Sequence, residues 1–362
     1  MSTVLLACVL AGCAVTARPP APPDEAALPP PPPTSEGRDL AAENARCEGC
    51  HEDVAAEWRG SLHQRSWEDP VFLAAYSIEP LAFCRGCHAP EADPERPPDA
   101  AARAVGVGCV TCHTASLDVA GGPPLPAGAA APHPIGADPA LATTAACAGC
   151  HEFDFPRRDG ALMQGTLTEH RASPYSNTVC QSCHMKAASR ARGAPGKSHR
   201  FGVLDEPEVL RAAVSAEAFP RTDRSIVVRL RAAEVGHAFP TGDMFRRLEV
   251  RARVQGAGGE PIRAPSVVLE RVFRVHVGKN GITDRAEVRD DRVPASGAPR
   301  DVVVVFPEDV GGRTVRWEVA YRRMGPTLAA SFGLDLEDDE VIVARGTLDV
   351  APASGAQGAQ WR

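Results

Sequence analysis

The sequence predicts a multidomain α+β protein, in which a mostly helical or irregular N-terminal half precedes an antiparallel β-sandwich. Ten cysteines fall in repeated motifs between residues 40 and 205, a stretch rich in Ala, Gly and Pro and poor in branched apolar side chains. From about residue 206, apolar and polar residues alternate with the period of two that is typical of strands. The 362 residues are enough for two domains of average size.

The composition excludes several classes of protein. The formal net charge of −7 argues against a surface that binds nucleic acid. No run of 18 apolar residues occurs, so the sequence predicts no transmembrane helix. A scaffold held mainly by disulfides is not expected either, because such scaffolds are usually short.

The N-terminus resembles a bacterial lipoprotein signal. Residues 1–12 are short, apolar and end in small residues, and Leu10-Ala11-Gly12-Cys13 matches the lipobox of that family. The resemblance implies cleavage before Cys13 and acylation of Cys13, which would anchor the chain on the periplasmic side of a bacterial membrane. Ala14, where Asp would retain the protein, favours the outer membrane by the same resemblance. The alternative is an ordinary signal peptide with a chance cysteine.

A proline-rich linker is expected at residues 13–39. Nine prolines between residues 18 and 38 preclude a packed core and favour extended polyproline II. Such a segment would hold a globular body away from the membrane as a stiff stalk. The alternative is a disordered leader with no such role.

The ten cysteines after Cys13 all lie in C-x-x-C-H motifs. The five motifs consist of Cys47, Cys50 and His51; Cys84, Cys87 and His88; Cys109, Cys112 and His113; Cys147, Cys150 and His151; and Cys180, Cys183 and His184. Two thiols at this spacing add to the two vinyl groups of one haem, and the following histidine becomes the proximal ligand of its iron. The sequence therefore predicts five covalently attached haems c and a pentahaem domain at residues 40–205.

Two other uses of paired cysteines fit less well. Zinc ribbons use C-x-x-C pairs but do not need a histidine after each pair. Redox dithiols of the thioredoxin kind need a βαβ context, which is missing here. Haems would also supply the apolar core that residues 40–205 lack, so we expect this half to be unfolded without them.

Histidines outside the motifs are candidates for the second axial position of each iron. The predicted distal ligands are His63, His133, His170, His199 and His237. His237 lies in a Gly- and Pro-rich turn between two expected strands, where loops commonly carry function. His276 lies in an alternating strand and is expected to fill a sheet face. Met163, Met185 and Met244 are alternative ligands.

Several phrases resemble the multihaem cytochromes c, in particular the class that includes the tetrahaem electron acceptors of hydroxylamine oxidation. The phrases are EDVAAEWRGSLH, FCRGCHAP, GVGCVTCH, CQSCHM with a downstream SHRF, and GHAFPTGD. The resemblance covers about residues 43–247. In that family the histidines of W-x-x-S-x-H and G-H-x-F-P-T-G are distal ligands, which implies that role for His63 and His237. Hydroxylamine oxidoreductases themselves carry more haems, so their activity is not expected here.

The β-sandwich is expected at residues 206–352, followed by a disordered tail at residues 353–362. Alternating stretches occur at 225–234, 246–255, 266–278, 300–306, 313–323 and 339–350, with Gly, Pro and Asp between them. If His237 binds an iron, the first hairpin of this domain reaches into the haem domain, and the two form one rigid unit. Outward arginines such as Arg229 and Arg251 would form either a solvated face or a docking face for an acidic partner.

The expected function is electron transfer through a chain of haems, by a carrier rather than a catalyst. Its partners would be other redox proteins or cytochromes, together with the membrane that holds the lipid anchor. The alternative is a multihaem oxidoreductase that acts on a small nitrogen or sulfur oxyanion at one open haem. A scaffold in which the haems are only structural is not favoured, because five redox cofactors would serve no purpose there.

The first prediction concerns the number of haems. Intact mass measurement of the mature chain should find five covalent haems, because every cysteine after Cys13 belongs to a C-x-x-C-H motif. Four or fewer haems in fully matured protein, or zinc in the preparation, would contradict it.

The second prediction concerns anchoring. Cys13→Ser should release a soluble cytochrome with an unchanged haem spectrum, because the linker separates the acylated residue from the haems. The measurement is the partition of haem absorbance between membrane and soluble fractions. A variant that stays on the membrane in high salt would show that the lipobox interpretation is wrong.

Overall fold

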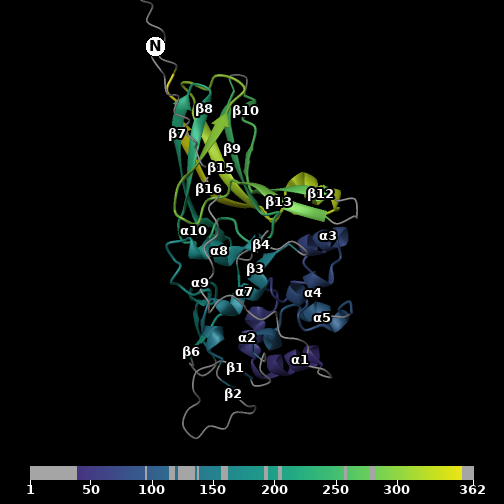
Figure 1. Ribbon diagram of the computed structural model, residues 1–362. Coiled ribbons are helices and arrows are strands. Elements are labelled where there is room, and N and C mark those ends of the chain that lie inside the picture. The colour runs from purple at the N-terminus through teal and green to yellow at the C-terminus, as the bar shows by residue number, and fades with distance from the viewer. Residues whose placement is uncertain are drawn as a thin grey trace, which may run out of the picture.

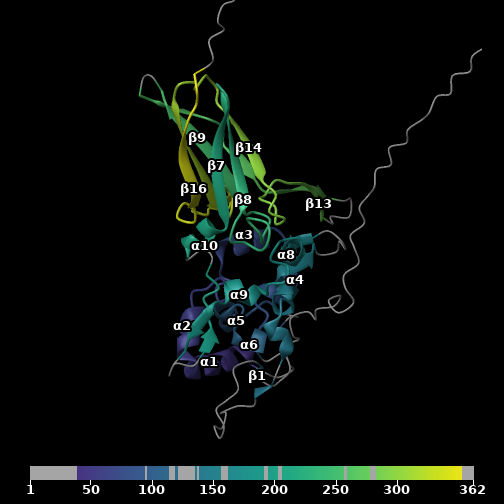
Figure 2. The same ribbon diagram turned by 90° about the vertical axis from the view of Figure 1, so that its left-hand side faces the viewer.

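The computed structural model places helices in one part of the molecule and most strands in the other, and the two parts lie end to end (Figure 1, Figure 2). It describes residues 39–93, 96–113, 119–120, 135–136, 138–155, 162–190, 195–202, 206–256, 259–277 and 283–352. The predicted α+β class is confirmed. The lipobox with Cys13, nearly all of the proline-rich linker, His133 and the tail lie outside the described residues, and the domain boundaries stay predictions.

Short helices make up the N-terminal part. They are α1 (Leu40–Cys50), α2 (Glu52–Trp58), α3 (Pro70–Ile78), α4 (Ala82–His88), α5 (Ala100–Val105), α6 (Cys109–His113), α7 (Ala145–His151), α8 (Thr166–Arg171) and α9 (Cys180–His184), with a 3-10 turn at Pro139–Ala142. Three two-stranded sheets lie among them: β1 (Val119–Ala120) with β2 (Ile135–Gly136), β3 (Glu152–Asp154) with β4 (Leu162–Gly165), and β5 (Ala187–Ser189) with β6 (Pro195–Lys197).

Side-chain caps rather than a large core define several of these helices. Asp39, Asp69 and Asp99 accept hydrogen bonds from backbone amides of the first turns of α1, α3 and α5, which is the usual role of Asp at this position. The apolar cluster beside α3 is small, and Trp67 is its only large fully buried side chain among the described residues. This part therefore has little core of its own, as the composition predicts.

Antiparallel sheets of three and five strands form the larger C-terminal part. The first has the order β14 (Arg300–Val305), β8 (Ser225–Ala232), β7 (Val214–Thr222). The second has the order β10 (Pro261–Arg263), β9 (Arg247–Gln255), β15 (Thr314–Arg322), β16 (Val341–Asp349), and β11 (Val267–Leu269) also pairs with β9. A separate hairpin of β12 (Arg271–Val277) and β13 (Thr283–Asp290) extends sideways towards α3, as Figure 1 shows. The helices α10 (Pro207–Ala212) and α11 (Pro326–Ser331) complete this part.

Alternate side chains of both sheets enter one apolar cluster. Ile226, Val228 and Leu230 of β8 are fully buried, and they share this cluster with Val250 of β9 and Val319 of β15. Burial of each such side chain contributes about 1.5–3 kcal/mol. The period-two pattern of the sequence is therefore a pattern of core contacts.

The predicted strands differ from the observed ones in two ways: one predicted stretch is divided, and β7, β10 and β13 were not predicted. The stretch 266–278 is divided into β11 and β12 around Glu270, whose carboxylate forms an ion pair with Arg247. Strand β7 was not predicted, because its sequence VSAEAFPRT contains Pro220 and shows little apolar alternation. It lies at an edge of its sheet, where proline is tolerated.

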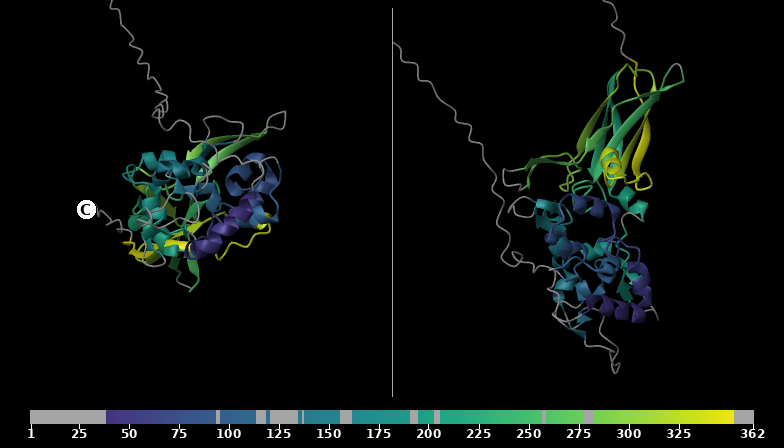
Figure 3. Two further views of the ribbon diagram at one scale, coloured as in Figure 1. Left: turned by 90° about the horizontal axis from the view of Figure 1, so that it is seen from below. Right: turned by 90° about the vertical axis from the view of Figure 1, so that its right-hand side faces the viewer.

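Contacts join the two parts at their junction, which the right-hand view of Figure 3 shows from another side. Arg323, which follows β15, donates to both carboxylate oxygens of Asp69 at 2.7 and 2.6 Å. Arg285 of β13 donates to Glu79 at 3.2 Å. Val71 of α3 packs with Met324 in a buried cluster. Separating the parts would break both of these ion pairs.

The third prediction tests this junction. Asp69→Ala removes the cap of α3 and leaves Arg323, whose side chain is only 8% exposed, without its main partner. We expect a loss of about 3–5 kcal/mol in the free energy of unfolding, as for other broken buried pairs. Urea denaturation of the haem-loaded protein measures it.

The matched control is Asp301→Ala. Asp301 pairs with Arg229 across two strands, but its side chain is 46% exposed. Its removal should cost far less than the removal of Asp69, because water screens an exposed ion pair. Equal losses in the two variants would contradict the role given to the Asp69–Arg323 pair.

Candidate functional site

Each C-x-x-C-H motif forms the last turn of a helix. The motif cysteines end helix α1 and lie within α4, α6, α7 and α9, and each motif histidine is the last residue of its helix or directly follows it. Residues three apart share one face of a helix, so both thiols of a motif can reach one porphyrin. All ten described cysteines are free thiols. This donor set fits covalent haem c, which would be held by the two thioethers and the adjacent imidazole.

Thiols of different motifs lie against one another. Hydrogen bonds join Cys47 to Cys109, Cys87 to Cys150, and Cys147 to Cys180. We number the motifs in chain order: motif 1 ends at His51, motif 2 at His88, motif 3 at His113, motif 4 at His151 and motif 5 at His184. Motif 1 therefore lies beside motif 3, and motif 4 lies beside motifs 2 and 5.

Cys112 and Cys150 lie close enough to interact electrostatically. Burial, and then the charge of Cys150, raise the pKa of Cys112 to about 11. Motif 3 is therefore near motif 4 as well.

Three motif histidines each face a second histidine from a distant part of the chain. The ring centroids of His63 and His151 lie 6.3 Å apart. The rings of His113 and His199, and those of His184 and His237, lie 6.2 Å apart. With a metal–nitrogen bond of about 2 Å and about 1.1 Å from nitrogen to ring centre, imidazoles on opposite sides of one metal have centroids about 6.2 Å apart. The three spacings fit an iron between each pair of rings.

Backbone carbonyls orient several of these rings. The Nδ1 atom of His237 donates to the carbonyl of Ala238 at 3.0 Å, and Nδ1 of His199 donates to Lys197 at 2.9 Å. Nδ1 of His88 donates likewise to Ser66 at 2.7 Å. A neutral ring that donates through Nδ1 keeps its lone pair on Nε2, which is the arrangement found in metal-bound histidines.

The electrostatic surroundings keep the rings neutral. Burial, and then the neighbouring imidazoles, lower the pKa of His63 to about 3. Burial lowers the pKa of His237 to about 4, although its hydrogen bond to Ala238 acts in the opposite direction. Both rings are therefore uncharged at neutral pH, in the form that binds iron.

The other candidate ligands have different surroundings. His170 is buried, donates through Nδ1 to the carbonyl of Gly236 at 2.8 Å, and has no partner for Nε2 among the described residues. No motif histidine ring lies against it in that part of the chain. His276 is exposed on β12. His133 lies outside the described residues, so its role stays a prediction.

Motif 2 is surrounded differently from motifs 3, 4 and 5. The ring of His88 stacks on Phe72 with centroids 3.6 Å apart and planes 12° apart. Within the described residues, no second histidine ring lies against that of His88. Nothing in the local sequence predicts this contact with Phe72.

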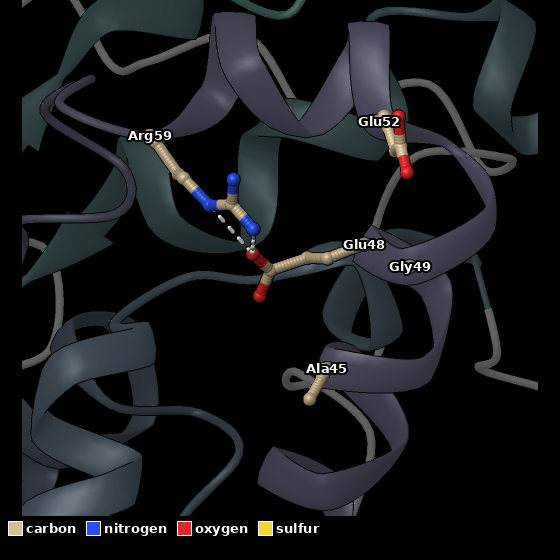
Figure 4. Close-up of a pocket in the computed structure, with 5 residues that line it drawn as sticks. All are labelled: Ala45, Glu48, Gly49, Glu52 and Arg59. Carbon is tan, nitrogen blue, oxygen red and sulfur yellow. Dashed lines mark hydrogen bonds and ion pairs between the residues drawn. The ribbon is translucent and has the colours of Figure 1, made fainter.

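A charged cavity opens beside motif 1. It has a volume of about 400 Å³ and is lined by Ala45, Glu48, Gly49, Glu52 and Arg59. Figure 4 shows Arg59 reaching across to Glu48, to which it donates through Nε at 2.8 Å. Glu48 and Gly49 are the two middle residues of motif 1, so this cavity borders the predicted attachment site of the first haem.

Two polar residues that position motif 3 were missed by the sequence analysis. Asn44, fully buried in α1, accepts from the backbone amide of Cys109 at 2.7 Å. Glu91 accepts from the amide and hydroxyl of Thr111 at 3.1 and 3.0 Å. A Cβ at Gly108 would collide with both side chains. The glycine directly before motif 3 is the one sequence signal of this close approach.

Two comparisons found known proteins that are similar to this chain. The family described as cytochrome c554 and c-prime matches residues 46–114, which contain motifs 1 to 3. The fold is similar to the crystal structure of a penta-heme cytochrome c552 from Thermochromatium tepidum, with a TM-score of 0.65 and 22% sequence identity. That similarity covers 86% of this chain and 99% of the other. No curated protein sequence matches the chain.

The fourth prediction concerns His237. His237→Ala should make one iron, that of motif 5, five-coordinate or water-bound, because its ring faces His184 at the spacing of two axial ligands. A high-spin ferric signal should appear in the EPR spectrum, and the potential of one haem should rise. His276→Ala, at an exposed histidine, serves as the control and should leave the spectrum unchanged.

The rival interpretation is that His237 only caps its turn by hydrogen bonding. On that view the variant would lose about 1 kcal/mol of stability and keep a fully low-spin spectrum. Such a spectrum would decide against ligation by His237.

Proposed function

We propose that the chain is a multihaem c-type cytochrome that serves as a pentahaem electron carrier. The observation that carries the proposal is the proximity of thiols from different motifs. Hydrogen bonds join motif 1 to motif 3 and motif 4 to motifs 2 and 5, and Cys112 of motif 3 lies near enough to Cys150 of motif 4 to interact electrostatically. When bound, each haem supplies an iron that is reversibly oxidised and reduced by one electron. Attachment sites this close would bring the porphyrins within range for electron exchange.

The ring pairs support an assignment of three distal ligands. His63 would serve the iron of motif 4, His199 that of motif 3, and His237 that of motif 5. His133 and His170 are kept as proposed ligands without an assigned iron. Filled axial positions suit a carrier, because no site is then open to a substrate.

The chain's own residues would set the conditions for these irons. Backbone carbonyls hold His199 and His237 in the ligating tautomer, and burial keeps both rings neutral. We infer that the two larger sheets form a β-sandwich, whose shared core is a rigid support for the loop that carries His237. His237 would then tie this domain to the haem domain.

We also propose the location and the class of partner. The lipobox would hold the chain by acylated Cys13 on the periplasmic side of the outer membrane, with other redox proteins or cytochromes as partners. The outward arginines do not favour one docking face, because Arg229 pairs with Asp301 and Arg251 with Glu340. Arg271 does not point outward: its side chain is only 8% exposed, pairs with Glu287 and donates to the carbonyls of Leu162 and Met163.

A second candidate function is catalysis at one open haem on a small nitrogen or sulfur oxyanion. The observation that favours it is that the ring of His88 stacks on Phe72, whereas no second histidine ring lies against it in the described part of the chain. If His88 were the only axial ligand of its iron, the opposite axial position would be open and could bind a substrate.

EPR of the fully oxidised protein distinguishes the two functions. A spectrum with low-spin ferric signals alone supports the carrier. A high-spin signal that changes when nitrite or sulfite is added supports the oxidoreductase. A protein whose haems all remain unreduced by dithionite would contradict both.

A further inference from the structure

A short sequence phrase occurs twice, each time at the end of a short helix. Residues 57–61 read Glu-Trp-Arg-Gly-Ser at the end of α2, and residues 169–173 read Glu-His-Arg-Ala-Ser at the end of α8. Each serine hydroxyl accepts a nearby backbone amide: Ser61 from Gln64 at 3.2 Å and Ser173 from Tyr175 at 3.1 Å. The two copies thus share a sequence pattern and a serine that accepts a backbone amide, three residues on in the first copy and two residues on in the second.

In the first copy, the glutamate holds the segment that carries His199. Glu57 Oε2 accepts from Arg190 Nη2 at 2.9 Å and from the backbone amide of His199 at 2.8 Å. Arg190 also donates to the carbonyl of Lys197, the same carbonyl that receives Nδ1 of His199. Both charged side chains are mostly buried, with 15% of Glu57 and 12% of Arg190 exposed.

In the second copy, the glutamate holds the segment that carries His237. Glu169 Oε1 accepts from Arg292 Nη2 at 2.7 Å, and Oε2 accepts from the hydroxyl of Thr241 at 2.6 Å. Arg292, only 5% exposed, donates through Nη1 to the carbonyl of Pro240 at 2.9 Å. The guanidinium therefore binds the backbone carbonyl of Pro240, and the carboxylate binds the side chain of Thr241, three and four residues beyond His237.

The ring that follows each glutamate also donates to a backbone carbonyl. Trp58 Nε1 donates to Val107, two residues before Cys109, at 2.9 Å. His170 Nδ1 donates to Gly236, the residue directly before His237, at 2.8 Å. In both copies, side chains of the repeated phrase therefore hydrogen-bond to segments that are distant in sequence and lie next to a predicted haem.

We propose that Glu57–Arg190 and Glu169–Arg292 are duplicated positioning clamps that hold His199 and His237 at the axial positions of their irons. The inference rests on the ligand assignment under the proposed function. His199 follows β6, and His237 lies between β8 and β9, so no regular structure fixes either ring. A buried carboxylate that binds both an arginine and the ligand-bearing segment supplies this constraint.

The clamps differ from an ion pair that only joins two parts of the fold. Arg285 and Glu79 form such a pair at the junction, and in the described residues neither side chain hydrogen-bonds to the segment of His199 or His237. Loss of that pair would weaken the junction and leave the rings in place. Loss of Glu57 would leave Arg190 buried without its charge partner. Loss of Glu169 would leave Arg292 paired with Asp290 but no longer joined to α8. In both cases water could compete with the histidine for iron.

Glu57→Gln and Glu169→Gln test the proposal, each in the full haem-loaded chain. Each variant should show a high-spin ferric EPR signal from up to about one of the five haems, because the distal histidine is no longer held. Added imidazole should convert this signal to low-spin, since it replaces the displaced ligand. Glu79→Gln is the matched control and should show neither effect.

Two sets of companion variants keep the outcomes distinct. Arg190→Lys and Arg292→Lys keep the charge but lose the planar guanidinium, and should show the same signal more weakly. They test the proposal even if the glutamate variants mature poorly. His199→Ala and His237→Ala report on the ligand assignment itself. If these alanine variants stay low-spin, the assignment is wrong. If they become high-spin while the glutamate and arginine variants behave like Glu79→Gln, the proposal that these ion pairs position the histidines is wrong.

Discussion

Most of the structure depends on one arrangement: the ring of a motif histidine lies opposite the ring of a histidine that is distant in sequence. His63 lies just after α2, near motif 1, yet its ring faces His151 of motif 4. His199 faces back to motif 3, and His237 crosses from the strand-rich part to motif 5. An iron between each pair would fasten segments that the apolar core does not connect, because the helical part buries few large side chains.

The strand-rich part contributes rigidity that the helical part lacks. Its apolar cluster draws on both larger sheets, and charged pairs such as Asp69–Arg323 join it to α3. The loop with His237 leaves this rigid body and enters the haem-bearing part, where Arg292 and Glu169 meet. Buried ion pairs stabilise little by themselves, so their value here would be geometric: they fix where a ligand can lie.

Much of this arrangement follows from local sequence, and the rest depends on contacts between distant residues. The C-x-x-C-H spacing predicts each attachment site, and period-two alternation predicts β8, β9, β14, β15 and β16, because both are properties of neighbouring residues. The pairing of His63 with motif 4 rather than motif 1 has no local signal, since it depends on how α2 packs. Asn44 and Glu91 were missed for the same reason, because their partners lie 65 and 20 residues away.

Iron-edge anomalous diffraction from crystals of the mature haem-loaded protein tests the central claim most directly. We expect five iron peaks, three of which lie between His63 and His151, His113 and His199, and His184 and His237, about 2 Å from the nearest ring nitrogens. Iron bound to His151, His113 or His184 with water or another side chain in place of the facing histidine would contradict the account.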